Sequence, residues 1–208
     1  MTIFNRQKMM GREAFKISSY GCSMGVEFID RSFFIPYAPR IMDGYDKAFV
    51  DAIADKAVRV RRFGFVAKFA AAPGSDYMFD EMVVFAVNDK DTWNGQEVGI
   101  RMRMDDGRIY GYIQDGNHEP DGNHNFIDTL LAKNDTRPHR YEIRISSKWR
   151  TSNLVEFEMD GRLRCSATLF PKKDFAKEKF YTVMATHRWE NGWDSGESYM
   201  KVWGIHIG

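Results

Sequence analysis

The segment from Tyr141 to Gly161 constrains the fold most, because apolar and polar residues alternate in it over two successive runs. The first run is YEIRI and the second is LVEFEMD. A period of two places alternate side chains on opposite faces of a strand. The predicted buried rows are Tyr141, Ile143 and Ile145 in the first run and Val155, Phe157 and Met159 in the second. The segment therefore predicts an antiparallel sheet with one face in the core and one face in water.

The second run ends at Asp160-Gly161, a pair that favours a two-residue hairpin turn. A third strand is predicted after it, in the run LRCSATL. Its predicted buried row is Leu163, Cys165, Ala167 and Leu169. The outward Glu156 and Glu158 are expected to be solvated.

Length and composition predict one independently folding domain, residues 1–208. The chain has 208 residues, of which 43% are hydrophobic and 14% aromatic, enough for a sizeable core. Thirty lysines and arginines balance 29 acids, for a formal net charge of +1. This balance gives no global electrostatic reason to expect nucleic acid or an anionic membrane as a partner. Oligomeric state is not predicted.

The sequence shows no pattern typical of a membrane span, a secretory signal or a cysteine-based site. No run of about 18 apolar residues predicts a membrane span, and the first residues do not resemble a secretory signal. We therefore expect a cytoplasmic protein, or a secreted one whose signal was removed. Cys22 and Cys165 lie far from other cysteines and from histidines, which predicts reduced thiols and no zinc site.

Strand signals dominate after Arg61, whereas residues 1–60 are irregular. The early part is expected to contain edge strands and one short helix, KAFVDAIADKAV, from Lys47 to Val58. Later runs alternate and are separated by Gly, Pro, Asn and Asp clusters. Many strands with almost no helix predict an all-β sandwich or jelly roll.

A long polar interval from Asp115 to Pro138 interrupts these strands and is predicted to be a loop. Long loops in compact domains are often functional. Its repeated GNH triplets offer a possible metal site, although Asn, Gly and Asp also simply form turns. The candidate ligands are Asp115, His118, Asp121 and His124.

Three segments together resemble the concanavalin A-like lectin and glucanase superfamily, most closely the laminarinase-type glycoside hydrolases of family sixteen. They are RRFGFVAKFAAAPG, HRYEIRISSKWRTSNLVEFEMDGRL and SYMKVWGIHI, and the resemblance runs from about Arg61 to Ile207. It implies a jelly-roll β-sandwich of two antiparallel sheets that binds a polysaccharide or oligosaccharide on its concave face. No cofactor is implied, although many relatives hold a structural calcium ion.

The strand that carries catalysis in that family departs from its pattern. Family sixteen enzymes place E-x-D-x-E on one strand, so that a nucleophile, a supporting aspartate and a general acid share one face. Here Glu97 matches the first glutamate, but Gly99 and Arg101 occupy the positions of the other two carboxylates. Retaining hydrolysis needs a second carboxyl about 5 to 5.5 Å from the nucleophile. The family's catalytic assignment is therefore not carried over.

The same strand and the next one predict a polar face instead. The buried row is expected to be Val98, Ile100, Met102 and Met104. Arginine forks bind carboxylate or sulfate and tyrosine rings stack on sugars, so the face suits a sugar polymer, including an acidic one. Arg and Tyr on a solvated sheet face also form cross-strand pairs without any ligand. The predicted exposed rows are Glu97, Gly99, Arg101 and Arg103, followed by Arg108, Tyr110, Tyr112 and Gln114.

Further site candidates lie elsewhere in the chain. Tryptophans in turns are either packed beneath a loop or kept for a ligand. Those predicted to bind a sugar are Trp93, Trp189 and Trp193, together with His187. Glu81 and Glu197, near two other strands, are the alternative catalytic partners of Glu97, although each is also typical of a solvated strand end.

Several functions remain open at this stage. One is a lectin-like carbohydrate-binding protein without turnover, and another is a glycoside hydrolase that uses Glu97 with Glu81 or Glu197. A third is a polysaccharide lyase in which Arg101 neutralises a uronate carboxylate while Tyr110, Tyr112 or His187 exchanges the proton. A non-carbohydrate interaction domain is the fourth, because a fold does not imply a function.

Overall fold

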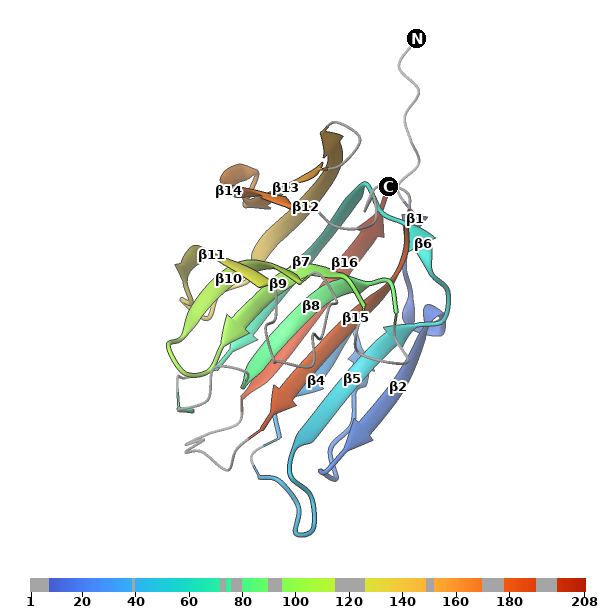
Figure 1. Ribbon diagram of the computed structural model, residues 1–208. Helices are drawn as coiled ribbons and strands as arrows, with labels where there is room; N and C mark the ends of the chain where they lie inside the picture. Colours follow the sequence, from blue (N-terminus) through green and yellow to red (C-terminus); the bar gives the residue numbers. More distant parts are fainter. Residues whose placement is uncertain are drawn as a thin grey trace.

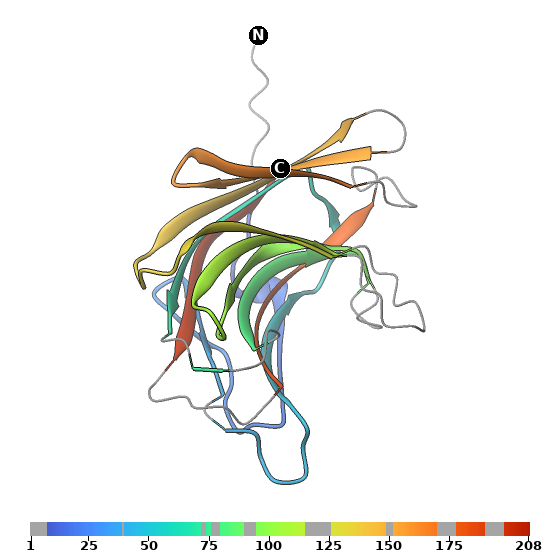
Figure 2. The same ribbon diagram turned by 60° about the vertical axis from the view of Figure 1, so that its left-hand side comes forward.

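The computed structural model contains two antiparallel sheets packed face to face (Figures 1 and 2). It describes residues 8–38, 40–71, 74–75, 80–89, 95–114, 126–148, 152–169, 178–189 and 198–208. Apart from the 3-10 turn Arg12–Ala14, the regular structure of this described part is all strand. The prediction of an all-β sandwich is confirmed.

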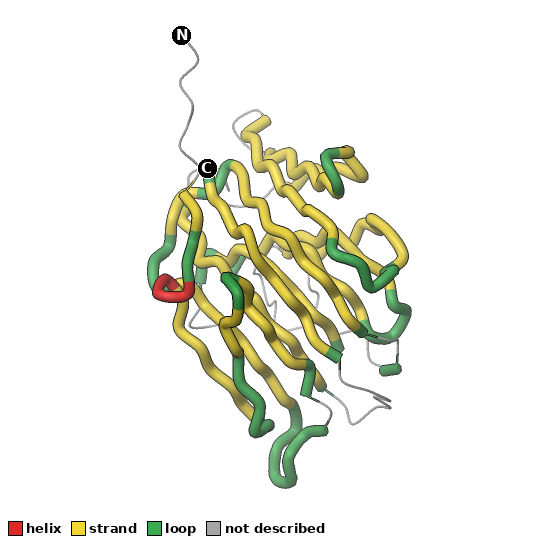
Figure 3. Tube along the Cα trace, turned by 180° about the vertical axis from the view of Figure 1, so that it is seen from behind, coloured by secondary structure: helices red, strands yellow, loops and turns green. Residues whose placement is uncertain are grey.

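Sheet A runs in the order β14-β13-β12-β7-β16-β4-β3, with β1 paired to β16. Its strands are β1 (Lys8–Met9), β3 (Glu27–Ile29), β4 (Ser32–Pro36), β7 (Arg62–Ala70), β12 (His139–Lys148), β13 (Ser152–Met159), β14 (Arg162–Leu169) and β16 (Tyr199–Ile207). Figure 3 shows this sheet from behind, with its strands side by side.

Sheet B runs in the order β11-β10-β9-β8-β15-β5-β2, with β6 paired to β15. Its strands are β2 (Phe15–Tyr20), β5 (Ala48–Ala54), β6 (Val58–Arg59), β8 (Glu81–Val87), β9 (Glu97–Arg103), β10 (Arg108–Gln114), β11 (Phe126–Lys133) and β15 (Lys179–Arg188). Every strand pair in both sheets of the described part is antiparallel.

The main core lies between the sheets, where one row of side chains from each strand meets the other sheet. The predicted inward row of β9 is confirmed, because Val98, Ile100, Met102 and Met104 are at most 1% exposed and belong to this core. Gly111 of β10 allows the sheets to approach, since a Cβ there would lie 2.6 Å from the Phe157 ring of β13. Apolar burial of this kind supplies most of the stability of a sandwich.

The predicted hairpin of β12, β13 and β14 is confirmed with one change. Strand β12 pairs with β13, and the Asp160-Gly161 turn leads into β14 with φ of 54° and 73° at its two residues. A register irregularity between Phe157 and Glu158 shifts the start of β14. As a result Leu163 lies opposite Glu158 and is 55% exposed, so its predicted place in the buried row is wrong.

Two predictions about secondary structure are also wrong. The segment expected to be a helix, from Lys47 to Val58, instead contains β5 and the first residue of β6. Part of the interval expected to be a loop, from Asp115 to Pro138, forms β11. The early residues contribute strands to both sheets, which extends the sandwich beyond the region that carries the sequence resemblance. Among the described residues, no helix is long and apolar enough to cross a membrane.

Candidate functional site on the outer face of sheet B

The outer face of sheet B, turned away from the main core, carries most of the predicted site residues. Strand register arranges its side chains in rows that cross the strands. One row passes along Tyr20, Phe49, His187, Glu81 and Arg103. A row nearer the other end of the strands passes along Ile53, Val183, Phe85, Gly99, Tyr112 and Asp128. Rows of this kind bring residues from distant parts of the sequence side by side.

The middle of this face is apolar and buried. A second hydrophobic cluster there is at most 4% exposed and consists of Val83, Phe85, Val87, Tyr112, Val183 and Ala185. Sheet B therefore buries side chains on both of its faces. The prediction of an exposed row is wrong at Glu97, Arg101 and Tyr112, which are 8%, 4% and 4% exposed. Gly99 is also buried, Arg103, Tyr110 and Gln114 are partly buried, and Arg108 is exposed.

Gly99 is required by the packing of Tyr112 across β9. A Cβ at this position would lie 2.8 Å from Cε1 of Tyr112 and 2.5 Å from Cβ of Phe85. Either distance is shorter than a normal carbon contact. The position at which the family-sixteen pattern expects an aspartate therefore has no space for a side chain.

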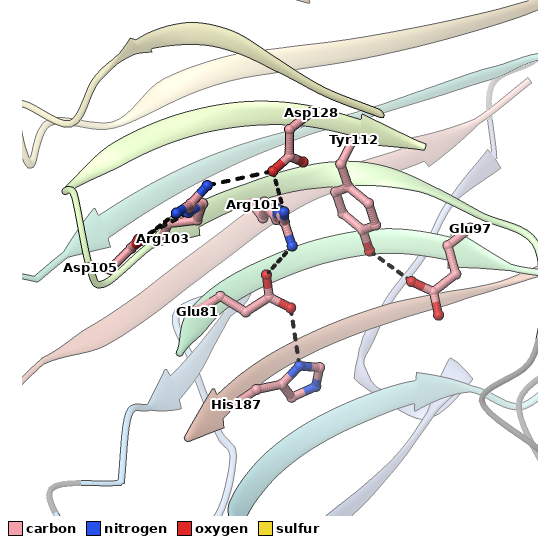
Figure 4. Close-up of polar contacts among 8 residues, drawn as sticks. All are labelled: Glu81, Glu97, Arg101, Arg103, Asp105, Tyr112, Asp128 and His187. Atoms are coloured by element: carbon pink, nitrogen blue, oxygen red, sulfur yellow. Dashed lines mark hydrogen bonds and ion pairs between the residues drawn. The ribbon is translucent and has the colours of Figure 1, made fainter. Parts of the chain in front are cut away.

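Arg101 connects two carboxylates across the face (Figure 4). Its guanidinium lies 3.2 Å from Oε2 of Glu81 and also forms an ion pair with Asp128 of β11. The Glu81 carboxylate in turn lies 3.2 Å from Nδ1 of His187 on β15. We call His187, Glu81, Arg101 and Asp128 the charged chain. All four side chains are between 5% and 14% exposed, so charge on them requires partners within the protein.

Burial and pairing act differently on the two carboxylates of the charged chain. Burial raises the pKa of Glu81, but the hydrogen bond from His187 and the charge of Arg101 outweigh it, so the net pKa is lowered. At Asp128 burial dominates and the pKa is raised, although Arg101 opposes this. Oδ1 of Asp128 is buried and has no hydrogen bond within the described part of the chain. Glu81 is therefore the more firmly ionised end of the pair.

Arg103 is also neutralised by neighbouring carboxylates. It forms an ion pair with Asp105, its Nη1 lies 3.8 Å from Oδ2 of Asp128, and its guanidinium lies 5.3 Å from the centre of the Tyr110 ring. The Tyr110 hydroxyl donates a hydrogen bond to Asp106. Because both arginines are paired internally, the expectation that they bind an acidic glycan is not favoured by this arrangement.

Glu97 lies in a dry environment next to Tyr112. The Tyr112 hydroxyl donates a hydrogen bond to Oε2 of Glu97 over 3.2 Å. Burial, with a further contribution from the charge of Glu81, raises the pKa of Glu97 to about 8. A carboxyl group with this pKa is protonated at neutral pH and can donate a proton.

Glu81 and Glu97, the two catalytic candidates within the described residues, lie at opposite ends of the paired strands β8 and β9. Glu97 pairs with Val87, whereas Glu81 is at the first position of β8, six residues earlier. At about 3.3 Å per residue, this register separates their backbones by roughly 20 Å. Their backbones are therefore farther apart than those of carboxylates on one E-x-D-x-E strand, but the two side chains extend toward each other (Figure 4), and the charge of Glu81 contributes to the raised pKa of Glu97. The third candidate, Glu197, lies outside the described residues.

Rings gather at the His187 end of the face. The Phe49 ring centre lies 4.9 Å from that of His187 and 5.3 Å from that of Trp189, which is 37% exposed. Nζ of Lys47 lies 4.7 Å from the centre of the Trp189 ring. Fully buried Asp80 fixes this position, because its Oδ1 accepts a 2.6 Å hydrogen bond from the Trp189 backbone.

Sequence reasoning missed Phe49 and Asp128. The sequence pattern places Phe49 in a helix and Asp128 in a loop, so it does not predict that either residue faces the site. The predicted Trp93 and Trp193 lie outside the described residues, as do the proposed metal ligands Asp115, His118, Asp121 and His124. Within the described residues, no group of three or more His, Cys, Asp or Glu is placed to hold a metal ion.

Comparison with solved structures identifies the fold. The chain superposes with a TM-score of 0.68 on the laminarinase catalytic domain from Thermotoga maritima MSB8, at 9% identity over 97% of each chain. It superposes with 0.66 on a prokaryotic β-1,3-1,4-glucanase (lichenase) from a mouse hindgut metagenome, at 10% identity over 97% of this chain and 98% of that one. For the endo-β-1,4-glucuronan lyase of the fungus Trichoderma reesei, the TM-score is 0.58 at 13% identity, over 99% and 92% of the chains.

No protein-family profile and no curated protein sequence matches the chain. The structural likeness confirms the predicted concanavalin A-like jelly roll. At 9 to 13% identity it shows the fold alone.

Proposed function

We propose that this protein binds a glycan at the His187 end of the outer face of sheet B and does not perform two-carboxylate retaining hydrolysis. The observation that carries the proposal is the partly exposed Trp189 ring, whose backbone is held by Asp80 and which lies beside Phe49, His187 and the charged chain. Sugars have an apolar face and polar edges. A ring of this kind can stack on the face, while nearby polar groups accept and donate hydrogen bonds.

The known structures support this proposal at the level of class. The solved proteins that share the fold are named as a laminarinase, a lichenase and a glucuronan lyase, all of which act on polysaccharides. A glycan ligand is therefore the chemistry to test first for the present chain, although a shared fold alone leaves other functions open.

Retaining hydrolysis is disfavoured by the contents of β9. Gly99 leaves no space for the supporting aspartate, and Arg101 carries a buried positive charge at the position of the second glutamate. A cation that holds Glu81 and Asp128 cannot serve as a general acid. Lyase chemistry is less supported as well, because it requires a cation free to neutralise a uronate, and Arg101, the residue expected in that role, is paired with Glu81 and Asp128.

The decisive experiment is a glycan array that contains neutral and acidic oligosaccharides. The hits are then incubated with protein and assayed for new reducing ends and for the absorbance of unsaturated uronates. We expect binding without product. Binding to none of the glycans would refute the proposal, and products would show turnover.

A matched pair of variants locates the binding site. Trp189→Ala should weaken binding of any hit by about 30-fold, the size of a typical aromatic hot spot. Trp203→Ala, on the outer face of sheet A, should leave affinity unchanged, because that ring packs under Lys201 on the other side of the sandwich. Equal losses in both variants would place binding elsewhere.

Hydrolysis through Glu97 is the second candidate function, favoured by one observation. Its pKa of about 8 and its hydrogen bond from Tyr112 are suited to a general acid at neutral pH. This function predicts new reducing ends that disappear in Glu97→Gln while glycan binding is retained. Product formation that survives this substitution would exclude Glu97 as the acid.

A further inference from the structure

Exposed apolar side chains concentrate at the edge of sheet B formed by β2 and β5. Tyr20, Tyr45 and Met42 are 46%, 45% and 45% exposed, and Trp189 next to them is 37% exposed. These four are half of the large hydrophobic residues that are exposed in the described part of the chain. Exposed apolar residues that gather on one edge are typical of a binding surface, whereas scattered ones are not.

The rings at this edge form a continuous series that reaches the proposed glycan site. The Tyr20 ring centre lies 5.0 Å from that of Tyr45 and 6.3 Å from that of Phe49, which also contacts His187 and Trp189. Register explains the continuity, because Tyr20 pairs with Phe49 and Phe49 pairs with His187. We call Tyr20, Tyr45, Phe49 and Trp189 the edge platform.

The edge platform is held in place by backbone contacts. The loop that carries Tyr45 extends past the strand ends between β4 and β5 (Figure 1). The Met42 N–H donates a 2.9 Å hydrogen bond to the Gly21 carbonyl, and the Tyr45 N–H donates one of 3.1 Å to the Met42 carbonyl. Gly21 has φ of 65°, and a Cβ there would lie 1.9 Å from the Lys47 carbonyl oxygen. A glycine is needed for this loop to approach β2, which presents the rings in a fixed position.

The charged side chains around the edge platform are of both signs. Arg40 pairs with Asp43 over 2.9 Å, and Asp51 accepts a 2.5 Å hydrogen bond from Ser18. Nζ of Lys47 lies 4.7 Å and 5.5 Å from the ring centres of Trp189 and Phe49. Arg40 and Lys47 are matched by the exposed carboxylates Asp43 and Asp46, so no excess of one sign is directed outward. The electrostatic complement of this surface is an uncharged ligand.

We propose that the edge platform is an extended binding surface for a neutral glycan chain, whose successive sugar units contact the exposed rings of Trp189, Tyr20 and Tyr45 in different orientations, because neighbouring rings of the platform meet edge to face. The inference rests on the proposed function, because the chain would start at the His187 end of the face. Because the middle of sheet B is buried, a long ligand that starts at Trp189 can continue along this edge over the exposed rings of Tyr20 and Tyr45. Affinity should therefore increase with the number of sugar units.

The test uses β-1,3-1,4-linked gluco-oligosaccharides of two to six units, titrated calorimetrically into the full chain. We expect the hexasaccharide to bind at least tenfold more tightly than the disaccharide. In the Tyr20→Ala and Tyr45→Ala double variant this gain should fall by about tenfold, the effect of losing stacked rings, while disaccharide affinity stays unchanged. Tyr20→Phe should retain most of the gain because it keeps the ring.

The control for general surface effects is Leu163→Ala, which removes an even more exposed apolar side chain from β14. An outcome in which the wild type binds this length series, or ladder, of gluco-oligosaccharides with the same affinity gain as the double variant would overturn the edge platform and leave the proposed function intact. If the wild type binds no member of this ladder, a ladder of oligogalacturonides is titrated, and binding confined to that acidic ladder would overturn the neutral ligand. Absence of binding to both ladders and to the whole array would remove both proposals.

A second copy of the chain is the other occupant to exclude. Sedimentation velocity of the wild type and the double variant should give the same mass. A wild-type dimer that the double variant dissociates would identify the edge platform as a subunit contact and overturn its role in glycan binding.

Discussion

Two arginine and carboxylate networks lie on opposite faces of the sandwich and differ in burial. On the outer face of sheet A, the Glu142 carboxylate forms two ion pairs. Its Oε2 lies 2.6 Å from Nη2 of Arg62, and its Oε1 lies 2.9 Å from Nε of Arg144. The arginine side chains there are 41% and 45% exposed. On the outer face of sheet B, the Arg101 side chain is 5% exposed and is held by two carboxylates. The sequence pattern is the same in both, with charged residues alternating with apolar ones.

The difference shows that alternation identifies the second face of a strand but not whether that face is wet. On sheet A the arginines of the charged face are solvated, and they cover Glu142, which is 4% exposed. Sheet B places an apolar cluster and the charged chain on its second face and buries both. Exposed ion pairs contribute little to stability, whereas a buried charge depends strongly on its partners. Substitutions on the two faces should therefore have unequal effects.

The largest difference is expected between the two arginines. Arg101→Met leaves the Glu81 and Asp128 carboxylates buried without their cation and should lower the free energy of unfolding by about 3 to 5 kcal/mol. Arg144→Met, on the solvated face, should lower it by about 0 to 1 kcal/mol, since Glu142 keeps Arg62. Urea unfolding monitored by tryptophan fluorescence measures both values. Similar losses would mean that burial does not separate the two networks.

The sequence predicted the sheet A hairpin well because its two faces have different environments. It predicted β5 as a helix because both faces of that strand are apolar or partly buried. Val50, Ala52 and Ala54 point into the main core, while Phe49 and Ile53 lie on the outer face of sheet B. With apolar residues on both faces, the period of two is lost and the spacing resembles a helix.

The candidate site was predicted only in part for a related reason. Residues close in sequence, such as Glu97, Arg101 and Tyr112, were correctly placed on one face. The partners from distant strands were not predicted. Phe49 contacts Trp189, and Asp128 pairs with Arg101, only because strands far apart in the sequence are neighbours in the sheet. Nothing in the local pattern around Leu163 signals the irregularity that turns it outward.

The second prediction concerns the pH dependence caused by Glu97. Its pKa is about 8 in the folded protein against an ordinary value of 4.5, so the folded state alone binds this proton between these pH values. The stabilisation is complete below pH 4.5 and is lost as pH rises through 8, at up to about 1.4 kcal/mol per pH unit. We expect the free energy of unfolding of the wild type to fall by about 3 kcal/mol from pH 5 to 8. In Glu97→Gln the same free energy should change much less with pH. If urea unfolding gave the same pH dependence for both proteins, Glu97 would not be protonated in the folded state at neutral pH.

The third prediction tests the packing over β9. Gly99→Ala forces Tyr112 or Phe85 to move and should destabilise the protein by about 1 to 3 kcal/mol. Gly25→Ala is the matched control, because no atom lies within 4 Å of its added Cβ, and it should change stability by about 0.5 kcal/mol or less. Thermal unfolding compares the two. A neutral Gly99→Ala would show that the outer face of sheet B can open at little cost.

The smallest effect is expected on the solvated side, at His139 of β12. Its Nε2 lies 2.9 Å from Asp135 and its Nδ1 lies 2.7 Å from Asp160. Partial burial opposes protonation, but the two carboxylates outweigh it and raise the pKa of His139. The resulting stabilisation is fully present below the ordinary histidine pKa of 6.5 and is lost as pH rises through the raised value.

Because the Asp160 side chain is 46% exposed and that of Asp135 is 36% exposed, solvent screening limits the effect of His139 to about 0.5 to 1 kcal/mol. It is measured in the Glu97→Gln background, which removes the larger proton linkage from the same pH range. The comparison is between that variant and Glu97→Gln with His139→Gln, unfolded in urea at pH 5.5 and 8.5. We expect the added substitution to cost more at pH 5.5 than at 8.5. An equal cost at both pH values would mean that the imidazole contributes packing alone and that its two carboxylate contacts are too solvated to affect its protonation.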